Sequence, residues 1–390
     1  MGGPPAIFTP AFLTAAVGNF LFFTNLSAFF LLPLHLKDLG AGEAQIGLIM
    51  GLYSGTAIFC QPVVGVWVDR TGRRPFMLSG AALAGVASFL FAAAPDALLL
   101  FPLLRILQGL AYSMYFIANF TLVVDLVPVE RRGQALGIFG ISGLTSTAVG
   151  PALGELVARA YGFQVFFLVV GAVAAAALVV TTRVEEPLAP RLGSREGLAG
   201  LLQGVLAAPR LPMTLASSFG LGTGVVFTFL PTYAAALGVE RIGLFAIAYS
   251  LGALAVRAIG GRLIDTLGRR PIIIPALGLQ ALGALFLAAL TLLVVQLGLP
   301  AVSILVLTGL LAGTAHGFLY PALSALVMDV TPAERRGRVI GVFSAFILIG
   351  QAAGAMGFGY LAHAVGYAPM FAILAACLAA ACALSFRLTP

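Results

Sequence analysis

Charged side chains are scarce in this chain, and their scarcity excludes most classes of protein. Only 9% of the 390 residues are Asp, Glu, Lys or Arg, whereas 61% are apolar. Soluble domains average about 25% charged and about 45–50% apolar residues. The composition therefore excludes a soluble globular domain and a disordered segment, and it indicates a protein that lies in a lipid bilayer.

The strand-like alternation of apolar and polar residues that is typical of an outer-membrane barrel is also missing. Apolar residues instead form long continuous runs, and about 20 apolar residues in a helix cross the hydrocarbon core. We therefore predict an all-α membrane protein with twelve transmembrane helices. The predicted spans are 11–36, 45–67, 75–94, 97–126, 134–158, 163–183, 211–236, 242–264, 271–295, 301–327, 338–362 and 367–386.

Residue patterns that carry catalytic or redox chemistry are lacking as well. Cys60, Cys377 and Cys382 fall inside apolar runs and do not have the spacing of a metal or redox motif. We find no Gly-rich phosphate loop, no Ser/His/Asp set and no metal-spaced His cluster. The sequence therefore predicts a protein that is not an enzyme, with no cofactor and no metal, and with a gradient as its energy source.

The basic residues that are present gather on one side of the predicted membrane. Sixteen arginines fall in the loops after the even-numbered spans or at the C-terminus, whereas the other side holds only Lys37, Arg159 and Arg241. Positively charged loops stay in the cytoplasm. The formal charge of +7 is therefore explained by topology rather than by nucleic-acid binding, and both termini are predicted to be cytoplasmic.

The two sets of six spans repeat each other. Residues 65–75 (G-V-W-V-D-R-T-G-R-R-P) match residues 261–271 (G-R-L-I-D-T-L-G-R-R-P) at an offset of 196. D-L-V-P-V-E-R-R-G after the fourth span matches D-V-T-P-A-E-R-R-G after the tenth at an offset of 204. Matching loops on the same side indicate two halves in parallel orientation. We predict a first half at 1–184, a cytoplasmic linker at 185–210 and a second half at 211–390.

Together these features resemble the major facilitator superfamily over essentially the whole chain. The loop after the second span carries the signature of that family in full, and the loop after the eighth span repeats it. The fourth and fifth spans carry R-x-x-Q-G and G-P-x-x-G, the second of which is typical of exporters in the drug:proton antiporter group. The matching residues are Gly65, Asp69, Arg70, Gly72, Arg73 and Arg74; Gly261, Asp265, Gly268, Arg269 and Arg270; Arg105, Gln108 and Gly109; and Gly150, Pro151 and Gly154. The resemblance implies alternating access, with a substrate site between the halves near the midplane.

The duplicated loop has a physical role that the residues themselves suggest. Asp69 can bond the free N–H groups at a neighbouring helix N-terminus, and the arginines can pair with Asp125 at the end of the fourth span. Gly65 and Gly72 permit a close helix approach and a tight turn. Such a cluster would hold one closed arrangement of the halves and break as they rock apart, which is the gating role that the resemblance implies; the alternative is a static turn with positive-inside charge. The gating candidates outside the signature itself are Asp125, Arg131 and Asp329.

Proline and glycine inside the fifth span allow two interpretations. Pro151 removes a backbone hydrogen bond and is expected to kink the helix beside Gly150. The glycines of this span also form a small-residue face for close packing. In the resemblance such a bend helps to seal the cytosol during export, and the alternative is ordinary tight packing.

Ionisable residues inside predicted spans are functional candidates, because a charge in the hydrocarbon costs roughly 2.5–3.5 kcal/mol. Arg105 has a role in proton or substrate coupling, which the resemblance implies, or it bonds a carbonyl or carboxylate group in a purely structural role. Arg257 joins the Asp265 cluster, snorkels to the interface or is functional. Glu155 carries a proton or pairs with Arg159, four residues on. His316, a residue type that titrates near neutral pH, is functional or merely a satisfied hydrogen-bonding group.

The first span has no carboxylate, whereas proton-coupled exporters of cationic drugs commonly carry an acid in the cavity. The cavity-lining spans of the resembled family would be polar and aromatic here, with a positive formal charge. We therefore expect neutral or anionic cargo in preference to cationic drugs. The substrate and proton candidates are Asn19, Asn25, Arg105, Gln108, Tyr112, Asn119, Glu155, Arg257, His316 and Tyr320.

The sequence thus predicts a secondary active transporter that moves a small organic molecule by alternating access, through proton-coupled efflux. One alternative is an importer or facilitator of a sugar or organic acid. Another, from a different class, is a non-transporting receptor or lipid-handling protein, which would leave the duplicated loops unexplained. The expected partners are a small-molecule substrate, protons and the bilayer of the cell membrane, with no nucleic acid, and the chain is expected to act as a monomer.

Overall fold

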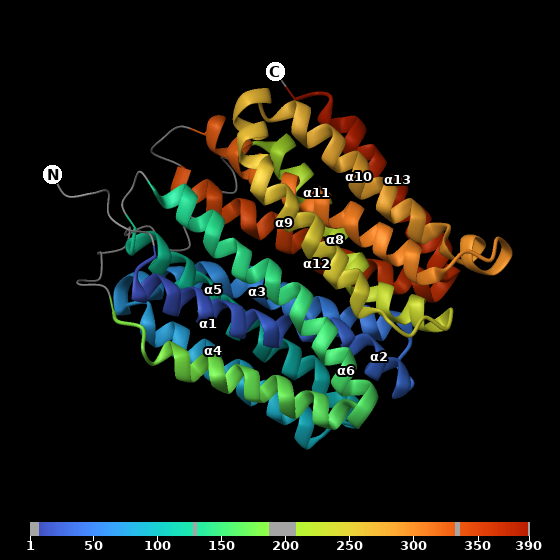
Figure 1. Cartoon of the computed structure of the whole chain (residues 1–390), viewed down its shortest axis with the longest axis horizontal. Coiled ribbons are helices and arrows are strands. Elements are labelled where there is room, and N and C mark those ends of the chain that lie inside the picture. The colour runs from blue at the N-terminus through green and yellow to red at the C-terminus, as the bar shows by residue number, and fades with distance from the viewer. Residues whose placement is uncertain (1–7, 128–130, 187–207, 332–335, 389–390) are drawn as a thin grey trace. The chain divides into compact units, whose positions relative to one another are not determined.

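The computed structural model describes residues 8–127, 131–186, 208–331 and 336–388, and within these ranges it leaves a few side chains undescribed. The described residues form helices and short connections, without a strand (Figure 1). The all-α class predicted from the sequence is confirmed.

Twelve main helices follow one another in the described part of the chain, labelled as in Figure 1. They are α1 (Pro10–Ala28), α2 (Leu32–Asp38), α3 (Glu43–Thr71), α4 (Arg74–Ala93), α5 (Phe101–Asp125), α6 (Arg132–Thr181), α8 (Arg210–Ala236), α9 (Gly243–Leu267), α10 (Arg270–Ala288), α11 (Ala301–Asp329), α12 (Arg336–Val365) and α13 (Tyr367–Ser385). Short 3-10 turns lie at Phe29–Leu31 and Leu98–Leu100, and a π-helical turn lies at Leu292–Gln296.

Ten helices in the described part of the chain are long and apolar enough to cross a membrane. One of them, Gln134–Thr181, contains two predicted spans, because Gly162 has a non-helical φ of 79° that reverses the chain between them. A shorter apolar stretch, Gly243–Arg257, lies within the predicted span 242–264, and the whole helix α9 extends from Gly243 to Leu267. The structure therefore accounts for all twelve predicted spans.

Helix α6 continues through Gly150 and Pro151, so the fifth span is not interrupted there. Gly150 faces α1 instead: a Cβ atom at this position would lie 2.7 Å from the carbonyl oxygen of Thr24 and 2.9 Å from the amide nitrogen of Ala28. No side chain fits at that distance. The observed role of Gly150 is thus the close packing of α1 on α6.

The helices group into two compact units. The first contains residues 1–29 and 59–197, and the second contains 30–58 and 198–390. Residues 30–58, which the sequence assigns to the first half, cluster with the second unit. The reason is close packing of α3 on α12, where a Cβ atom on Gly47 would overlap the Ala355 carbonyl and lie 3.0 Å from Cα of Gly359.

A ridge of glycines brings α9 and α11 into direct backbone contact in the second unit. Gly309, Gly313 and Gly317 recur every four residues, so they lie on one face of α11. A Cβ atom on Gly309 would lie 2.6 Å from the Phe245 carbonyl oxygen of α9, and one on Gly317 would lie 3.0 Å from the Ala253 carbonyl oxygen. Lipid tails supply no hydrophobic force between helices. Membrane helices therefore associate through close van der Waals contact at small residues.

We predict that Gly313→Ala destabilises the protein by about 1–3 kcal/mol, the usual cost of overpacking a tight contact. The added methyl group would overlap the Tyr249 carbonyl, and α9 would have to move away. Thermal unfolding of the detergent-solubilised protein measures the effect.

The matched control is Gly357→Ala on α12, where no described atom lies within 4 Å of the new methyl group. Alanine is the better helix former by roughly 1 kcal/mol, so this variant should be at least as stable as the wild type. Equal melting temperatures for the two variants would contradict the role of the glycine ridge.

Candidate functional site

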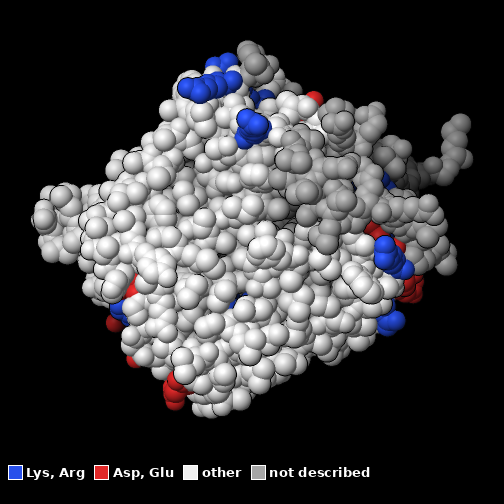
Figure 2. All heavy atoms as spheres, turned by 180° about the vertical axis from the view of Figure 1, so that it is seen from behind, with Lys and Arg blue, Asp and Glu red and all other residues white. Residues whose placement is uncertain are grey.

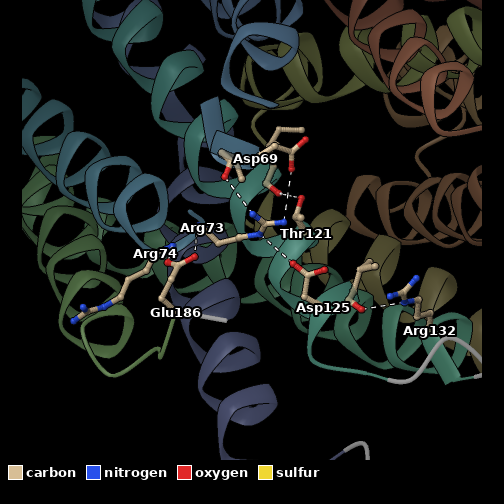
Figure 3. Close-up of polar contacts among 10 residues, drawn as sticks. Asp69, Arg73, Arg74, Thr121, Asp125, Arg132 and Glu186 are labelled. Atoms are coloured by element: carbon tan, nitrogen blue, oxygen red, sulfur yellow. Dashed lines mark hydrogen bonds and ion pairs between the residues drawn. The ribbon is translucent and has the colours of Figure 1, made fainter. Parts of the chain in front are cut away.

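A buried arginine organises the loop between α3 and α4 in the first unit. The Nε atom of Arg73 donates a hydrogen bond to Oδ2 of Asp125 at 3.0 Å, and its Nη1 atom donates to the Val68 carbonyl at 3.3 Å. An Asp69 carboxylate oxygen lies 3.7 Å from Nη2 (Figure 3). The Arg73 side chain is only 5% exposed. The predicted pairing with Asp125 is confirmed, and it ties the loop to the end of α5.

The N-terminus of α4 is bonded by Glu186, not by the Asp69 carboxylate that the sequence suggested for a helix N-terminus. The two Glu186 carboxylate oxygens accept hydrogen bonds from the backbone N–H groups of Arg73 and Arg74, each at 2.7 Å. A carboxylate is favoured here because the first N–H groups of a helix lack intrahelical partners. The carboxylate thereby joins the segment after α6 to the start of α4 (Figure 3).

Gly72 makes room for that carboxylate. A Cβ atom on Gly72 would lie 2.7 Å from Oε1 of Glu186, and the residue has a φ of 104° that favours glycine. Gly65 differs, because no described atom lies within 4 Å of its would-be Cβ. The close helix approach expected at Gly65 is therefore not observed in the described part of the chain.

The second unit repeats the arginine cluster with the same atoms. Nε of Arg269 donates to Oδ2 of Asp329 at 2.9 Å, and its Nη1 donates to the Ile264 carbonyl at 3.0 Å. The repeat extends to the next arginine: Nη2 of Arg74 donates to the Thr182 carbonyl, and Nη2 of Arg270 donates to the Phe386 carbonyl. Each residue of the first cluster is separated from its equivalent in the second by the offset of 196 or 204 residues found in the sequence.

The remaining gating candidates are placed as follows. Arg70 is exposed, and Gly154 is buried within α6. Arg131 immediately precedes α6, and its neighbour Arg132 donates from Nε to the Val124 carbonyl at 3.0 Å. Gly268 adopts a φ of 86° at the end of α9. Gly261 and the Asp265 side chain lie outside what the structure describes.

Arg105 and the asparagines of the first unit lie buried among the helices of that unit. Nη1 of Arg105 donates to Oε1 of Gln108, one turn along α5, at 2.8 Å. Asn119 donates to Asn19 at 3.3 Å, and Asn19 donates to Ser142 at 2.8 Å, which links α5, α1 and α6. These bonds give the residues a structural function, and their role in transport stays a prediction.

Asn25 and Tyr112 have different surroundings. Nδ2 of Asn25 donates to Ser88 of α4 and to the Val170 carbonyl of α6. Tyr112 is partly exposed, and its ring stacks on Phe116 at a centroid distance of 5.3 Å. Asn25 is therefore held inside the first unit, whereas Tyr112 retains an accessible aromatic face.

Glu155 forms the pair that its spacing suggests. Nε of Arg159 lies 3.6 Å from Oε1 of Glu155, one turn away on α6. The Glu155 side chain is 13% exposed and that of Arg159 is 47% exposed. The pairing is confirmed, and proton transport by Glu155 stays a prediction.

The second unit brings three of the predicted candidates together. Nδ1 of His316 lies 2.6 Å from the Tyr249 hydroxyl of α9, and the His316 ring is parallel to that of Tyr320 at 6.3 Å. Arg257 interacts electrostatically with both His316 and Tyr320. This cluster combines ionisable and aromatic groups on α9 and α11.

Glu43 and Glu186 form contacts that were not predicted from the sequence. Glu43 begins α3, pairs with Lys37, and accepts a hydrogen bond from the Tyr367 hydroxyl at 3.2 Å. Nδ1 of His363 lies 3.8 Å from its other oxygen. The opposite charges of Lys37 and Glu43 are visible in the sequence, but their contact with α12 and α13 depends on tertiary packing.

The surface is consistent with lipid exposure. Figure 2 shows one face on which uncharged residues cover the middle and nearly all charged side chains lie near the edges. Exposed apolar side chains such as Phe59, Leu99 and Leu156 are numerous. In a membrane protein these side chains face hydrocarbon rather than water.

Comparison with known proteins gives the same picture over the whole length. The family model described as Major Facilitator Superfamily matches residues 12–297 and 241–390. The multi-drug resistance efflux pump PmrA of Streptococcus pneumoniae is 26% identical over 383 residues, which cover 94% of this chain and 92% of PmrA. The multidrug resistance protein MdtG of Yersinia enterocolitica is 28% identical over 360 residues, which cover 88% of this chain and 84% of MdtG. The crystal structure of the nucleoside transporter NupG shares the fold, with a TM-score of 0.75 at 15% identity, and covers 96% of this chain and 99% of NupG.

We predict that Asp125→Asn destabilises the protein more than Asp329→Asn does. Arg73 is 5% exposed and Asp125 is 16% exposed, whereas the equivalent side chains Arg269 and Asp329 are 26% and 52% exposed. Losing a charged partner of a buried arginine costs about 1–3 kcal/mol, and losing an exposed pair costs up to ~1 kcal/mol. Thermal unfolding of both variants tests this difference, and an equal loss of stability would contradict it.

Proposed function

Because the chain belongs to the major facilitator superfamily, and is therefore a multi-pass membrane transporter, we propose that it exports small organic molecules in exchange for protons. The transport cycle is alternating access, in which binding of substrate and protons shifts the populations of two conformations. No Gly-rich phosphate loop is present in the sequence, which favours a gradient over ATP as the energy source.

The observation that carries the proposal is the duplicated arginine cluster. Arg73 and Arg269 each bond a carboxylate at the end of a helix two spans further on, and each bonds a carbonyl five residues earlier in the chain. A transporter that switches between two states needs contacts that hold one state and can be released. Polar contacts in loops serve this purpose, and the more exposed Arg269–Asp329 pair is the one that water can replace at low cost when it breaks. A receptor or lipid-handling protein would have no use for two such clusters.

The direction of transport is supported by the relatives and by the fifth span. PmrA is named as a multi-drug resistance efflux pump and MdtG as a multidrug resistance protein, and this chain carries Gly150, Pro151 and Gly154 in the G-P-x-x-G pattern of exporters. The second candidate is an importer or facilitator on the same scaffold. NupG, named as a nucleoside transporter, shares the fold at an identity too low to decide between them.

Everted membrane vesicles that report ΔpH with a dye test the proposal. We expect one panel among lipophilic cations, neutral antibiotics, sugars and organic acids to collapse ΔpH in vesicles that contain the protein. Vesicles without the protein are the control. Accumulation of a radiolabelled panel member without any movement of protons would contradict proton coupling and favour the facilitator.

We also predict that Asp69→Asn changes the rate of transport more than the apparent affinity. The Asp69 carboxylate lies 3.7 Å from Arg73 and is 42% exposed, so its loss weakens the loop cluster by about 0.5–1 kcal/mol, equivalent to a roughly two- to five-fold change in rate. Initial rates over a range of substrate concentrations separate the maximal rate from KM. Asp96→Asn, an exposed acid in the loop after α4, is the matched control. An unchanged maximal rate in Asp69→Asn would contradict the gating role.

A further inference from the structure

The second unit contains an arginine inside a membrane span that no described residue bonds. Arg257 lies in α9 and is partly buried, and its Nε atom is buried without a hydrogen-bond acceptor. Among the described side chains no carboxylate pairs with its guanidinium group. Arg257 closes the apolar stretch Gly243–Arg257, and an ionisable group within a span is costly unless something partners it, so its guanidinium group is a candidate to bind an anion.

Two further hydrogen-bonding side chains, those of His316 and Tyr320, lie on α11 within reach of the Arg257 charge. His316 has one hydrogen bond within the described part of the chain, from Nδ1 to the Tyr249 hydroxyl at 2.6 Å. If the phenol donates this bond, the ring proton is on Nε2, and Nε2–H is then available to an acceptor. The Tyr320 hydroxyl, one turn along, makes no hydrogen bond to a described residue and lies with His316 within electrostatic range of Arg257.

The glycine ridge fixes the relative positions of these groups. Gly317 follows His316 directly, and a Cβ atom on it would lie 2.8 Å from Cβ of Val256, the residue before Arg257. Arg257 follows Val256 and His316 precedes Gly317, so the backbones of Arg257 and His316 lie next to this close contact. A site on tightly packed helices is held more precisely than one on loops.

Aromatic rings surround the donors. The His316 ring meets Phe219 edge to face at a centroid distance of 5.1 Å, and it lies parallel to Tyr320 at 6.3 Å. Phe343 packs against Tyr320 at 5.9 Å. Planar ligands gain stacking and edge contacts with such rings, so the site favours an aromatic ligand.

The first unit lacks the arginine and the histidine at the equivalent positions. Offsets of 196 and 204 residues place Gln61, Tyr112 and Phe116 opposite Arg257, His316 and Tyr320. None of the three carries a charge at neutral pH. The set on α9 and α11 is therefore particular to the second unit and is not a general feature of the repeat.

We propose that Arg257, His316 and Tyr320 bind the carboxylate of a small aromatic monoanion. Arg257 supplies the charge, and His316 Nε2–H and the Tyr320 hydroxyl donate hydrogen bonds to the same carboxylate. The single formal charge of the site matches a single negative charge on the ligand. This inference rests on the proposed function and names the class of cargo for it.

The test is a binding measurement on the purified full-length protein in lipid nanodiscs. The probes are 1-naphthoate and its neutral isostere 1-naphthamide, measured by isothermal titration calorimetry. We expect the wild type to bind the acid at least ten-fold more tightly than the amide, since hydrogen bonds to a charged group are about that much stronger. Equal affinity for acid and amide in the wild type would overturn the proposal, and this comparison needs no variant to fold.

Variants then assign the binding to the cluster. Arg257→Gln is expected to weaken 1-naphthoate binding about ten-fold or more and to leave 1-naphthamide binding unchanged. Arg241→Gln, which removes an exposed arginine just before α9, is the matched control and should bind like the wild type. Unaltered binding of the acid by a well-folded Arg257→Gln would overturn the assignment.

The outcome is separable from that of the vesicle experiment. If 1-naphthoate binds through Arg257 but no panel moves protons, the site stands and proton-coupled export fails. If a cationic or neutral panel collapses ΔpH while 1-naphthoate does not bind, export stands and the carboxylate site is overturned.

Discussion

A lipid bilayer offers no hydrogen-bond partner to a peptide group, and this constraint underlies every feature of the structure. Backbone groups must bond within each segment, so the described membrane spans are helices. Lipid also removes the hydrophobic force between helices, so packing depends on close contact at small residues. Gly150 against α1 and Gly47 against α12 are examples of such contacts. The polar groups that remain within the spans are few, and each must be bonded by a neighbour or be available for function.

The sequence was sufficient to predict the helices and one contact of the loop cluster. The apolar runs located twelve spans, because length and hydropathy alone define a membrane helix. The Arg73–Asp125 bond followed from two motifs with opposite charge on the same predicted side. Glu186 could not be predicted in this role, since its bond to the first turn of α4 depends on the path of the chain after α6. The packing of residues 30–58 with the second unit was also missed, because glycine contacts between α3 and α12 leave no periodic signal.

The internal repeat of the sequence is matched by equivalent contacts in the two units, and the units also differ in particular contacts. The arginine clusters share their donor and acceptor atoms, but Arg73 is 5% exposed and Arg269 is 26% exposed. Glu186 bonds the first turn of α4 in the first unit. The ionisable side chains inside the spans also differ. In the first unit Glu155 pairs with Arg159 and Arg105 bonds Gln108. In the second unit His316 lies beside the Tyr320 ring. The arginine cluster of the first unit is thus the more buried of the two. The second unit has the ionisable group that lies among aromatic rings.

The backbone contact between α9 and α11 has a mechanical consequence. Helices that touch at three successive glycines cannot slide or tilt past each other without overlap between the Gly313 face and the Tyr249 carbonyl. We therefore expect the two helices to move together during a conformational cycle. A ligand held by side chains of both helices keeps the same set of bonds while the pair moves, so changes in its affinity must arise from groups outside the pair.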